Sequence, residues 1–593
     1  MGKRILRTIV AFGIPQFALL GAVLFATYMI ILITHPGFGY KRFLFFSIDN
    51  KTLVSFFESV LILIWCFTYF IYLIGTIYRM KTGRSYWLDR IKYRRNWFSL
   101  IDYFQNADAH LCDTNQFPDG PWYEQEGIIL AELPDEEKTV CLPSTAEANV
   151  FVVGPPGSRK TTGIVQPTCV SHQGSILCVD IKGDIYNFCK DHRRILRFCP
   201  DLTDENGNSI AIEHSCHFDP FSGLQNMSET ERKNYLDNMA LSLIPNEPGE
   251  GGSYFPARAR KLFSGIIHFL MSKDPSITFP DVLHAILHLR RPGGVNMENF
   301  PQSVFQWVET IIDSDCLPAI ELVGSLLGNN EKNISGAWDT LSTALTPFSN
   351  EVLNVLLDGR GEQCISVDAM ENGFDVYLQI DQKHLKIYAP LFTMILSTFM
   401  QDFTSRPDTS TPKGQQNRPI LCMLDEFPRL TFSYEMIDSF LSTLRSKSVQ
   451  CMLIAQNCSQ LSRKYKEDGL TAILGNCNYQ LMLKSNDENT QRHFSHLFGT
   501  KKVLKISNSV DELFPSKSSR TAQEAREPVF YPEDFGDMGM NIYIYFDGKR
   551  IEGRKIVSYE SFGKYSSQKS SPRYESAAVK TFYEKLYESK SIK

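Results

Sequence analysis

The chain has 593 residues, of which 43% are hydrophobic and 21% are charged, a composition that excludes a mostly disordered protein. It carries 61 Lys and Arg against 66 Asp and Glu, which gives a net charge of -5. This charge excludes a protein that coats nucleic acid through bulk positive charge, but it does not exclude a local basic groove. Its 14 cysteines form no Cys-x-x-Cys pair, which argues against zinc ribbons and thioredoxin-like sites.

Two long apolar segments come first. Ile9–Thr34 contains no charged residue, and Leu53–Tyr78 contains only Glu58. Each has 26 residues, which gives a helix of about 39 Å against a hydrocarbon core of roughly 30 Å. We therefore predict a two-helix transmembrane hairpin within residues 1–80. The alternative is a cleaved signal peptide followed by a buried helix.

The distribution of positive charge predicts the orientation of this hairpin. Lys and Arg are more frequent before the first span and after the second than in the loop between them. Both termini are therefore expected on the cytoplasmic side of the membrane. The rest of the chain would form a cytoplasmic body hung from the hairpin.

A glycine-rich loop follows a short β-like run, Phe151–Val153. Its residues are Gly154-Pro155-Pro156-Gly157-Ser158-Arg159-Lys160-Thr161-Thr162. A strand, such a loop, Lys-Thr and a helix form the order of a phosphate-binding loop. We expect the loop N–H groups to bind the β-phosphate, Lys160 to approach the β- and γ-phosphates, and Thr161 to bind Mg²⁺. The usual glycine before the lysine is replaced by Arg159, and the alternative is a Gly/Pro turn with an accidental Lys-Thr.

An acidic pair ends a second apolar run. Ile420–Leu424 is continuously apolar, as in a buried parallel strand, and Asp425 and Glu426 follow it. We expect Asp425 to hold Mg²⁺ through water, and Glu426 to orient and deprotonate the attacking water.

A third apolar run, Cys451–Ala455, ends in Gln456. A polar residue at that strand tip is placed to sense the γ-phosphate. Arg445 lies between the second and third runs, and it is either an arginine finger toward a neighbouring subunit or a member of a surface ion pair.

The two halves of this predicted site are far apart in sequence. Lys160 and Asp425 are separated by 265 residues, more than a compact nucleotide-binding core needs. From about residue 228 to 345, helical periods such as Ala257–Leu270 replace strand-like runs. The pattern therefore predicts an inserted all-α domain.

Strand-like segments are expected at Ser175–Asp180 before this insertion, and from Phe374–Ile380 through Asn541–Tyr545 after it. The predicted division is a nucleotide-binding domain in two parts, 81–227 and 346–562, an all-α domain at 228–345, and a C-terminal tail at 563–593.

With these residues in view, the chain resembles the coupling proteins of type IV secretion and conjugation systems, which are relatives of septal chromosome pumps. The resemblance covers nearly all of the chain. Besides the two spans and the phosphate loop, it rests on Asp180-Ile181-Lys182-Gly183-Asp184, Leu424-Asp425-Glu426-Phe427-Pro428, Ile454-Ala455-Gln456-Asn457, Asn476-Cys477 and Asn486-Asp487. Asp184 departs from the glutamate that the family has at that position.

The resemblance implies a RecA-like α/β P-loop core, ATP and Mg²⁺ at subunit interfaces, and a homo-hexameric ring at the bacterial inner membrane. Its implied function is ATP-driven delivery of substrates to a type IV secretion channel. The substrates are relaxase-bound single-stranded DNA, effector proteins or both. Two alternatives stay open: a membrane-tethered receptor with little hydrolysis, which Arg159 motivates, and a general DNA pump.

Overall fold

The computed structural model describes residues 111–246, 254–287, 301, 303–326, 331–359, 363–509 and 519–557. All of them belong to the second of two compact units, Met1–Phe104 and Gln105–Lys593. The two predicted spans and the predicted tail lie outside the described residues. Within the described ranges, no helix combines the length and apolar character that a membrane crossing requires.

An eleven-stranded sheet organises this unit, with the strand order β2-β1-β13-β12-β9-β3-β8-β7-β4-β6-β5. The strands from β9 to β5 in this order are parallel, and β12, β13, β1 and β2 continue the sheet in antiparallel pairs. The strands are β1 (Ile128–Leu133), β2 (Lys138–Leu142), β3 (Val150–Val153), β4 (Ser175–Asp180), β5 (Ile195–Phe198), β6 (Asp375–Gln379), β7 (Ile420–Leu424), β8 (Val449–Ala455), β9 (Tyr479–Met482), β12 (Asn541–Phe546) and β13 (Lys549–Arg554).

The central strands are buried on both faces. Along β3, Val150 and Val152 belong to one hydrophobic core, and Phe151 and Val153 belong to another. Successive side chains of a strand point to opposite faces, so the sheet separates these two cores. Strands in such a position need apolar residues throughout, which explains why β3, β4 and β7 have uninterrupted burial.

Asn149 fixes the start of β3 against its neighbours. The side chain is fully buried, and its Oδ1 accepts a hydrogen bond from the Cys451 N–H at 3.0 Å. Its Nδ2 donates to the carbonyl oxygens of Leu441, at 3.0 Å, and Asn476, at 3.1 Å. One amide therefore satisfies three backbone groups from segments about 300 residues away in sequence.

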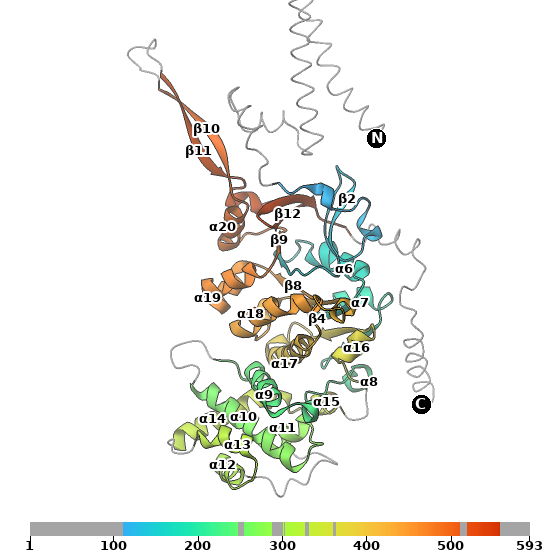
Figure 1. Ribbon diagram of the computed structural model, residues 1–593, viewed down its shortest axis with the longest axis vertical. Coiled ribbons are helices and arrows are strands. Elements are labelled where there is room, and N and C mark those ends of the chain that lie inside the picture. Colours follow the sequence, from blue (N-terminus) through green and yellow to red (C-terminus); the bar gives the residue numbers. More distant parts are fainter. Residues whose placement is uncertain are drawn as a thin grey trace, which may run out of the picture. The chain divides into compact units, whose positions relative to one another are not determined.

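Between β5 and β6 the described residues form helices and no strand (Figure 1). The longest of these, α10, packs against α13 and α14. Apolar side chains of these helices continue one core of the sheet without a break, so the helical part and the sheet share a hydrophobic interior. The helices are α8 (Ala211–His214), α9 (Glu229–Leu243), α10 (Tyr254–Lys273), α11 (Phe279–Leu287), α12 (Val304–Ile312), α13 (Leu317–Gly324), α14 (Glu331–Leu345), α15 (Glu351–Leu356) and α16 (Val367–Glu371).

Other helices accompany the sheet strands along the chain. They are α6 (Gln166–Ser171), α7 (Asp184–Cys189), α17 (Leu385–Thr404), α18 (Tyr434–Thr443), α19 (Cys458–Gly475) and α20 (Glu488–Leu497). After α20, β10 (Thr500–Ser509) and β11 (Ser519–Pro528) pair antiparallel as a separate two-stranded sheet (Figure 1). This hairpin is not among the strands predicted from the sequence.

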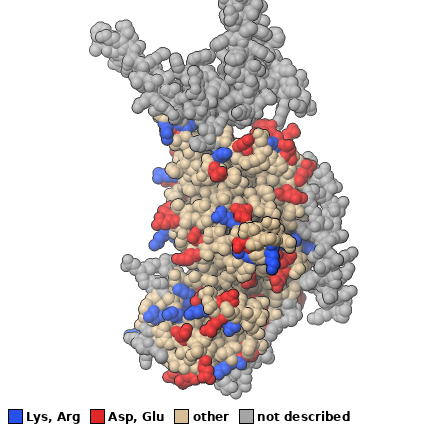
Figure 2. Space-filling view, viewed as in Figure 1, with Lys and Arg blue, Asp and Glu red and all other residues tan. Residues whose placement is uncertain are grey.

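Charged residues of both signs are interspersed over the described surface on the face that Figure 2 shows. This distribution agrees with the near-equal numbers of basic and acidic residues in the chain.

Candidate nucleotide site

The glycine-rich loop leaves the carboxyl end of β3 and turns into a helix. Its first residue, Gly154, donates its N–H to the Ala455 carbonyl oxygen at 3.2 Å, which attaches the loop to the tip of β8. Gly157 has φ +79°, and a Cβ added there would meet no atom within 4 Å. The following helix begins with a π-helical turn, η3 (Thr161–Val165), and continues as α6. Free N–H groups at the start of a helix attract anions.

Lys160 folds back over the loop. Its Nζ donates to the carbonyl oxygens of Gly154 and of Pro155, the latter at 3.3 Å. Burial lowers the pKa of Lys160, the carboxylates of Asp425 and Glu426 oppose this change, and Lys182 adds to it. The ammonium is therefore close to both acidic residues, although they lie about 265 residues away in sequence.

The strand order explains this convergence. Because β3, β8 and β7 are parallel neighbours, their carboxyl ends meet at one edge of the sheet. Burial, followed by Glu426 and Asp180, raises the pKa of Asp425 to about 6, and Lys160 opposes the change. The structure thus brings Lys160, Asp425 and Glu426 into one site.

Glu426 and Gln456 contact each other directly. The Gln456 Nε2 donates to Glu426 Oε1 at 2.7 Å. Glu426 itself has φ +51°, a left-handed conformation that side-chain-bearing residues seldom adopt. The Gln456 amide on Oε1 and the Arg429 guanidinium, whose Nε lies 3.5 Å from Oε2, hold this carboxylate on the strained backbone at the tip of β7.

The chain beyond Glu426 is held by α19, which begins just after Gln456. The Lys464 ammonium donates to the Leu430 carbonyl oxygen, and the Tyr465 ring stacks on Phe427 with 6.2 Å between centroids. The segment after Glu426 is therefore packed directly against α19.

Asp180 ends β4 beside this site. Its carboxylate accepts hydrogen bonds from the backbone N–H groups of Lys182 at 3.4 Å, Gly183 at 2.9 Å and Tyr186 at 2.8 Å. These bonds shape the turn that carries Lys182, which is close enough to Lys160 to affect its pKa. In the sequence Lys182 belongs to the motif Asp180–Asp184, and no pattern there predicts a role for it.

Arg445 lies elsewhere. It belongs to η9 (Leu444–Lys447), immediately before β8, so it sits at the amino edge of the sheet. The seven residues of β8 place about 20 Å between that edge and the edge with the phosphate loop. Arg445 Nη1 donates to Asn478 Oδ1 at 3.4 Å. Within one chain Arg445 does not reach Lys160, so its predicted role requires the nucleotide of a neighbouring subunit.

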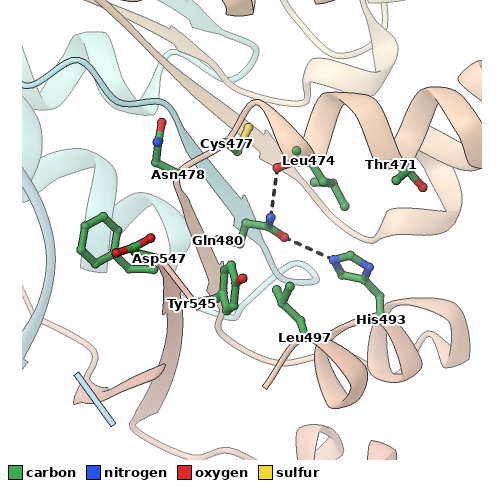
Figure 3. Close-up of a pocket in the computed structure, with 11 residues that line it drawn as sticks. Thr471, Leu474, Cys477, Asn478, Gln480, His493, Leu497, Tyr545 and Asp547 are labelled. Carbon is green, nitrogen blue, oxygen red and sulfur yellow. Dashed lines mark hydrogen bonds between the residues drawn. The ribbon is translucent and has the colours of Figure 1, made fainter. Parts of the chain in front are cut away.

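A pocket of about 490 Å³ opens at this amino edge, between α19, β9, α20 and the β12–β13 turn (Figure 3). The buried Gln480 in its wall donates from Nε2 to the Leu474 carbonyl oxygen at 3.0 Å, and its Oε1 lies 3.2 Å from His493 Nε2. No residue of the phosphate loop lines this pocket, which is separate from the site at the carboxyl edge.

The residues at the carboxyl edge fit a nucleotide phosphate and Mg²⁺. Ser158 Oγ is buried and has no hydrogen-bond partner among the described residues. The open space at Gly157 and a lysine whose ammonium rests on loop carbonyl oxygens complete an anion cradle. The hydroxyl of Thr161 and the carboxylate of Asp425 are oxygen ligands of the kind that Mg²⁺ prefers.

Comparison with known proteins supports this interpretation. A family model described as Type IV secretory system Conjugative DNA transfer matches residues 113–584. Protein VirD4 of Agrobacterium fabrum is 23% identical over 392 residues, which are 65% of this chain and 54% of VirD4. The conjugal transfer protein TraG of Escherichia coli is 24% identical over 410 residues, which are 65% of this chain and 61% of TraG. The chain spans about half to three fifths of the length of these relatives.

Solved structures share the fold. The unbound conjugative coupling protein TrwB superposes with a TM-score of 0.53 at 14% identity, covering 70% of this chain and 86% of that chain. TrwB in complex with ADP and Mg²⁺ gives a TM-score of 0.51 at 14% identity, covering 70% and 87%. The predicted resemblance to coupling proteins and the α/β core with its large parallel sheet, which matches the RecA-like fold of TrwB, are confirmed.

Proposed function

Because this chain belongs to the type IV secretory system conjugative DNA transfer family, we propose that it is a coupling ATPase that recruits substrates and delivers them to a type IV secretion channel. The observation that carries the proposal is the convergence of Lys160 with Asp425 and Glu426 at one edge of the sheet. The TrwB structures with an ATP analogue and with ADP and Mg²⁺ support ATP and Mg²⁺ as the cofactors.

Each residue of the site has a proposed task in ATP hydrolysis. The loop Gly154–Thr162 wraps the phosphates, and the Lys160 ammonium neutralises their charge. Thr161 and Asp425 hold Mg²⁺, which supplies further neutralisation when bound. Glu426 accepts a proton from the attacking water, and Gln456 keeps the Glu426 carboxylate in place through their hydrogen bond.

The proposal extends to the setting of this ATPase. The two apolar segments 9–34 and 53–78 would anchor the chain in the bacterial inner membrane, with both termini and the body from residue 81 in the cytoplasm. The division into nucleotide-binding parts at 81–227 and 346–562, an all-α domain at 228–345 and a tail at 563–593 belongs to the same proposal. Six copies would form a ring in which Arg445, at the amino edge of the sheet, reaches the nucleotide of the next subunit.

The cargo would be relaxase-bound single-stranded DNA, effector proteins or both, and the partners would be the components of the secretion channel. The relatives VirD4 and TraG, and the family description of conjugative DNA transfer, support this assignment. Crosslinking in cells, followed by identification of the retained nucleic acid or polypeptide, determines which cargo is carried.

ATP hydrolysis by the full chain tests the site. Lys160→Ala is expected to abolish turnover and to weaken nucleotide binding, because it removes the ammonium that lies on the loop near Asp425 and Glu426. Lys413→Ala, at an exposed position away from the site, is the matched control and should turn over normally. Unchanged turnover in Lys160→Ala would reject the assignment.

One observation favours a second candidate, a membrane-tethered receptor that hydrolyses slowly. Arg159 has φ +71° at the position where the usual loop has glycine. A gain in turnover for Arg159→Gly would support the receptor, and no gain in binding or turnover would count against it. A deletion strain that still exports its DNA and proteins normally would favour the general DNA pump.

A further inference from the structure

Three basic residues from distant parts of the chain lie near the phosphate loop. Arg159 belongs to the loop, Lys484 follows β9, and Lys555 follows β13. Leu483, next to Lys484, donates its N–H to the Val153 carbonyl oxygen at 3.1 Å, so the chain at Lys484 runs along the tip of β3.

Gly163 shows how closely Arg159 and the chain after β13 approach. A Cβ built on Gly163 would lie 3.7 Å from Arg159 Cβ and 3.2 Å from the Ile556 carbonyl oxygen. The segment with Lys555 and Ile556 therefore packs beside the first helical turn after the loop.

Lys555 is unusual for a lysine because only 6% of its surface is exposed. Its Nζ donates to the Gly539 carbonyl oxygen at 2.9 Å. Among the described residues no carboxylate pairs with Lys555, Lys484 or Arg159. Burial, then the charges of Arg159 and Lys484, lower the pKa of Lys555 to about 8. An anion that binds to such a cluster stabilises it.

The cluster and the acidic residues lie on opposite sides of the loop. Asp425 follows β7, which is separated from β3 by β8, whereas Lys484 follows β9 on the other side of β3. The charged groups that act on Lys160 are Asp425, Glu426 and Lys182, and the charged groups that act on Lys555 are Arg159 and Lys484. The loop is therefore flanked by a metal-binding side and by a second, purely cationic side.

We propose that Arg159, Lys484 and Lys555 form a second phosphate-binding group for the nucleotide held by the Lys160 loop. The nucleotide is the favoured ligand because Arg159 directly precedes Lys160 in the loop. A phosphate bound by Lys160 therefore lies beside the residue that begins the cluster. The inference rests on the proposed nucleotide site and adds to it the residues that bind the phosphates from the side opposite the metal. It also gives the departure from glycine at position 159 a purpose, since the arginine supplies a charge that glycine lacks.

Binding of ADP to the full chain, measured by titration calorimetry, tests the cluster without any hydrolysis. Lys484→Gln and Lys555→Gln should each weaken ADP binding about tenfold, which corresponds to one charge-assisted hydrogen bond. The control Lys413→Gln, at an exposed site, should bind as the unchanged chain does. Since Lys484 is only partly buried, Lys484→Gln serves as the variant whose fold is least disturbed.

The pH dependence gives a second readout. Free Lys555 loses its proton near pH 8, and an anion favours the protonated form, so ADP affinity should fall as the pH rises from 8 to 9. Lys555→Gln should remove this part of the fall, whereas Lys484→Gln should retain it and move it to higher pH, because the charge of Lys484 lowers the pKa of Lys555.

Three outcomes overturn the inference. If the unchanged chain binds ADP and both variants bind it equally well, the cluster has no role in nucleotide binding, while the proposed function stands. If the variants lose affinity for a single-stranded oligonucleotide and keep their affinity for ADP, the cluster binds nucleic acid instead. If the unchanged chain binds neither ADP nor ATP, the proposed nucleotide site and the inference fail together.

Discussion

Arg159 offers a direct test of how the loop backbone is held. Its φ of +71° lies in the left-handed region, where a side chain places Cβ too near the following carbonyl oxygen. Glycine adopts this conformation freely, whereas any other L-residue is destabilised by about 1–2 kcal/mol. Arg159→Gly and Arg159→Ala both remove the guanidinium, so the comparison between them isolates the backbone effect.

We expect the glycine variant to be the more stable of the two by about 1 kcal/mol, after allowing about 0.5–1 kcal/mol for the greater freedom of glycine in the unfolded chain. For the unit Gln105–Lys593 the unfolding entropy is about 1 kcal/mol/K, so the thermal midpoint should differ by only about 1 °C.

Nucleotide affinity is the more sensitive assay. If the free alanine variant relaxes out of the left-handed conformation, it has to enter it again on binding, and the about 1 kcal/mol then appears as roughly fivefold weaker ADP binding for Arg159→Ala than for Arg159→Gly, in place of the difference in stability. Equal affinities in calorimetric titrations, or a better-binding alanine variant, would show that the left-handed geometry at position 159 is not what the nucleotide requires.

Three further predictions concern other contacts. Gln456→Ala removes the 2.7 Å hydrogen bond to Glu426 and should slow steady-state ATP turnover about tenfold while leaving the Kd for ADP unchanged; a changed Kd with normal turnover would contradict the positioning role. His172 is fully buried, and burial followed by the charge of Arg193 lowers its pKa to about 3, below the ordinary value of 6.5. The stability that the neutral His172 contributes is therefore complete above about pH 6.5 and is lost as the pH falls toward 3, with a loss of about 2 kcal/mol at pH 5. Between pH 7 and 5 the thermal midpoint of His172→Asn should fall less than that of the unchanged chain. Equal falls in the two proteins would refute this. Asn149→Leu leaves two buried backbone groups and one partly buried backbone group without their partner and should lower the free energy of unfolding by about 3 kcal/mol. Calorimetry measures this loss, and a thermal midpoint within about 1 °C of that of the unchanged chain would exclude it.

The parts of the fold that the sequence predicts best are those with one dominant physical signal. β7 is buried on both faces and appears as five consecutive apolar residues, so Ile420–Leu424 was predicted with its observed bounds. β8 begins two residues before the predicted run because Gln450 interrupts the apolar pattern. The Gln450 amide is buried nevertheless, since its Nε2 donates to the carbonyl oxygens of Pro143, at 3.1 Å, and Ala146, at 2.8 Å. A pattern of residue types does not contain such distant partners.

The same distinction holds for the candidate site. Lys160, Asp425 and Glu426 follow apolar strands in a recognisable order, so their proximity could be predicted from the sequence. Lys484 and Lys555 follow β9 and β13, strands that were not predicted, and no local pattern distinguishes them from surface lysines. Their proximity to Arg159 depends on the order of the strands in the sheet, which the sequence alone did not provide.

The position of β3 in the sheet has a consequence for the synthesis of the protein. Its two neighbours, β8 and β9, both lie far downstream, so the four apolar residues of β3 leave the ribosome about 300 residues before β8 exists. At 5–20 residues per second this interval is roughly 15–60 s. During that time the nascent chain presents an unpaired hydrophobic segment, which is open to aggregation and to binding by a holdase chaperone. A chaperone that binds β3 should therefore be sought on ribosome-bound chains truncated between residues 160 and 440.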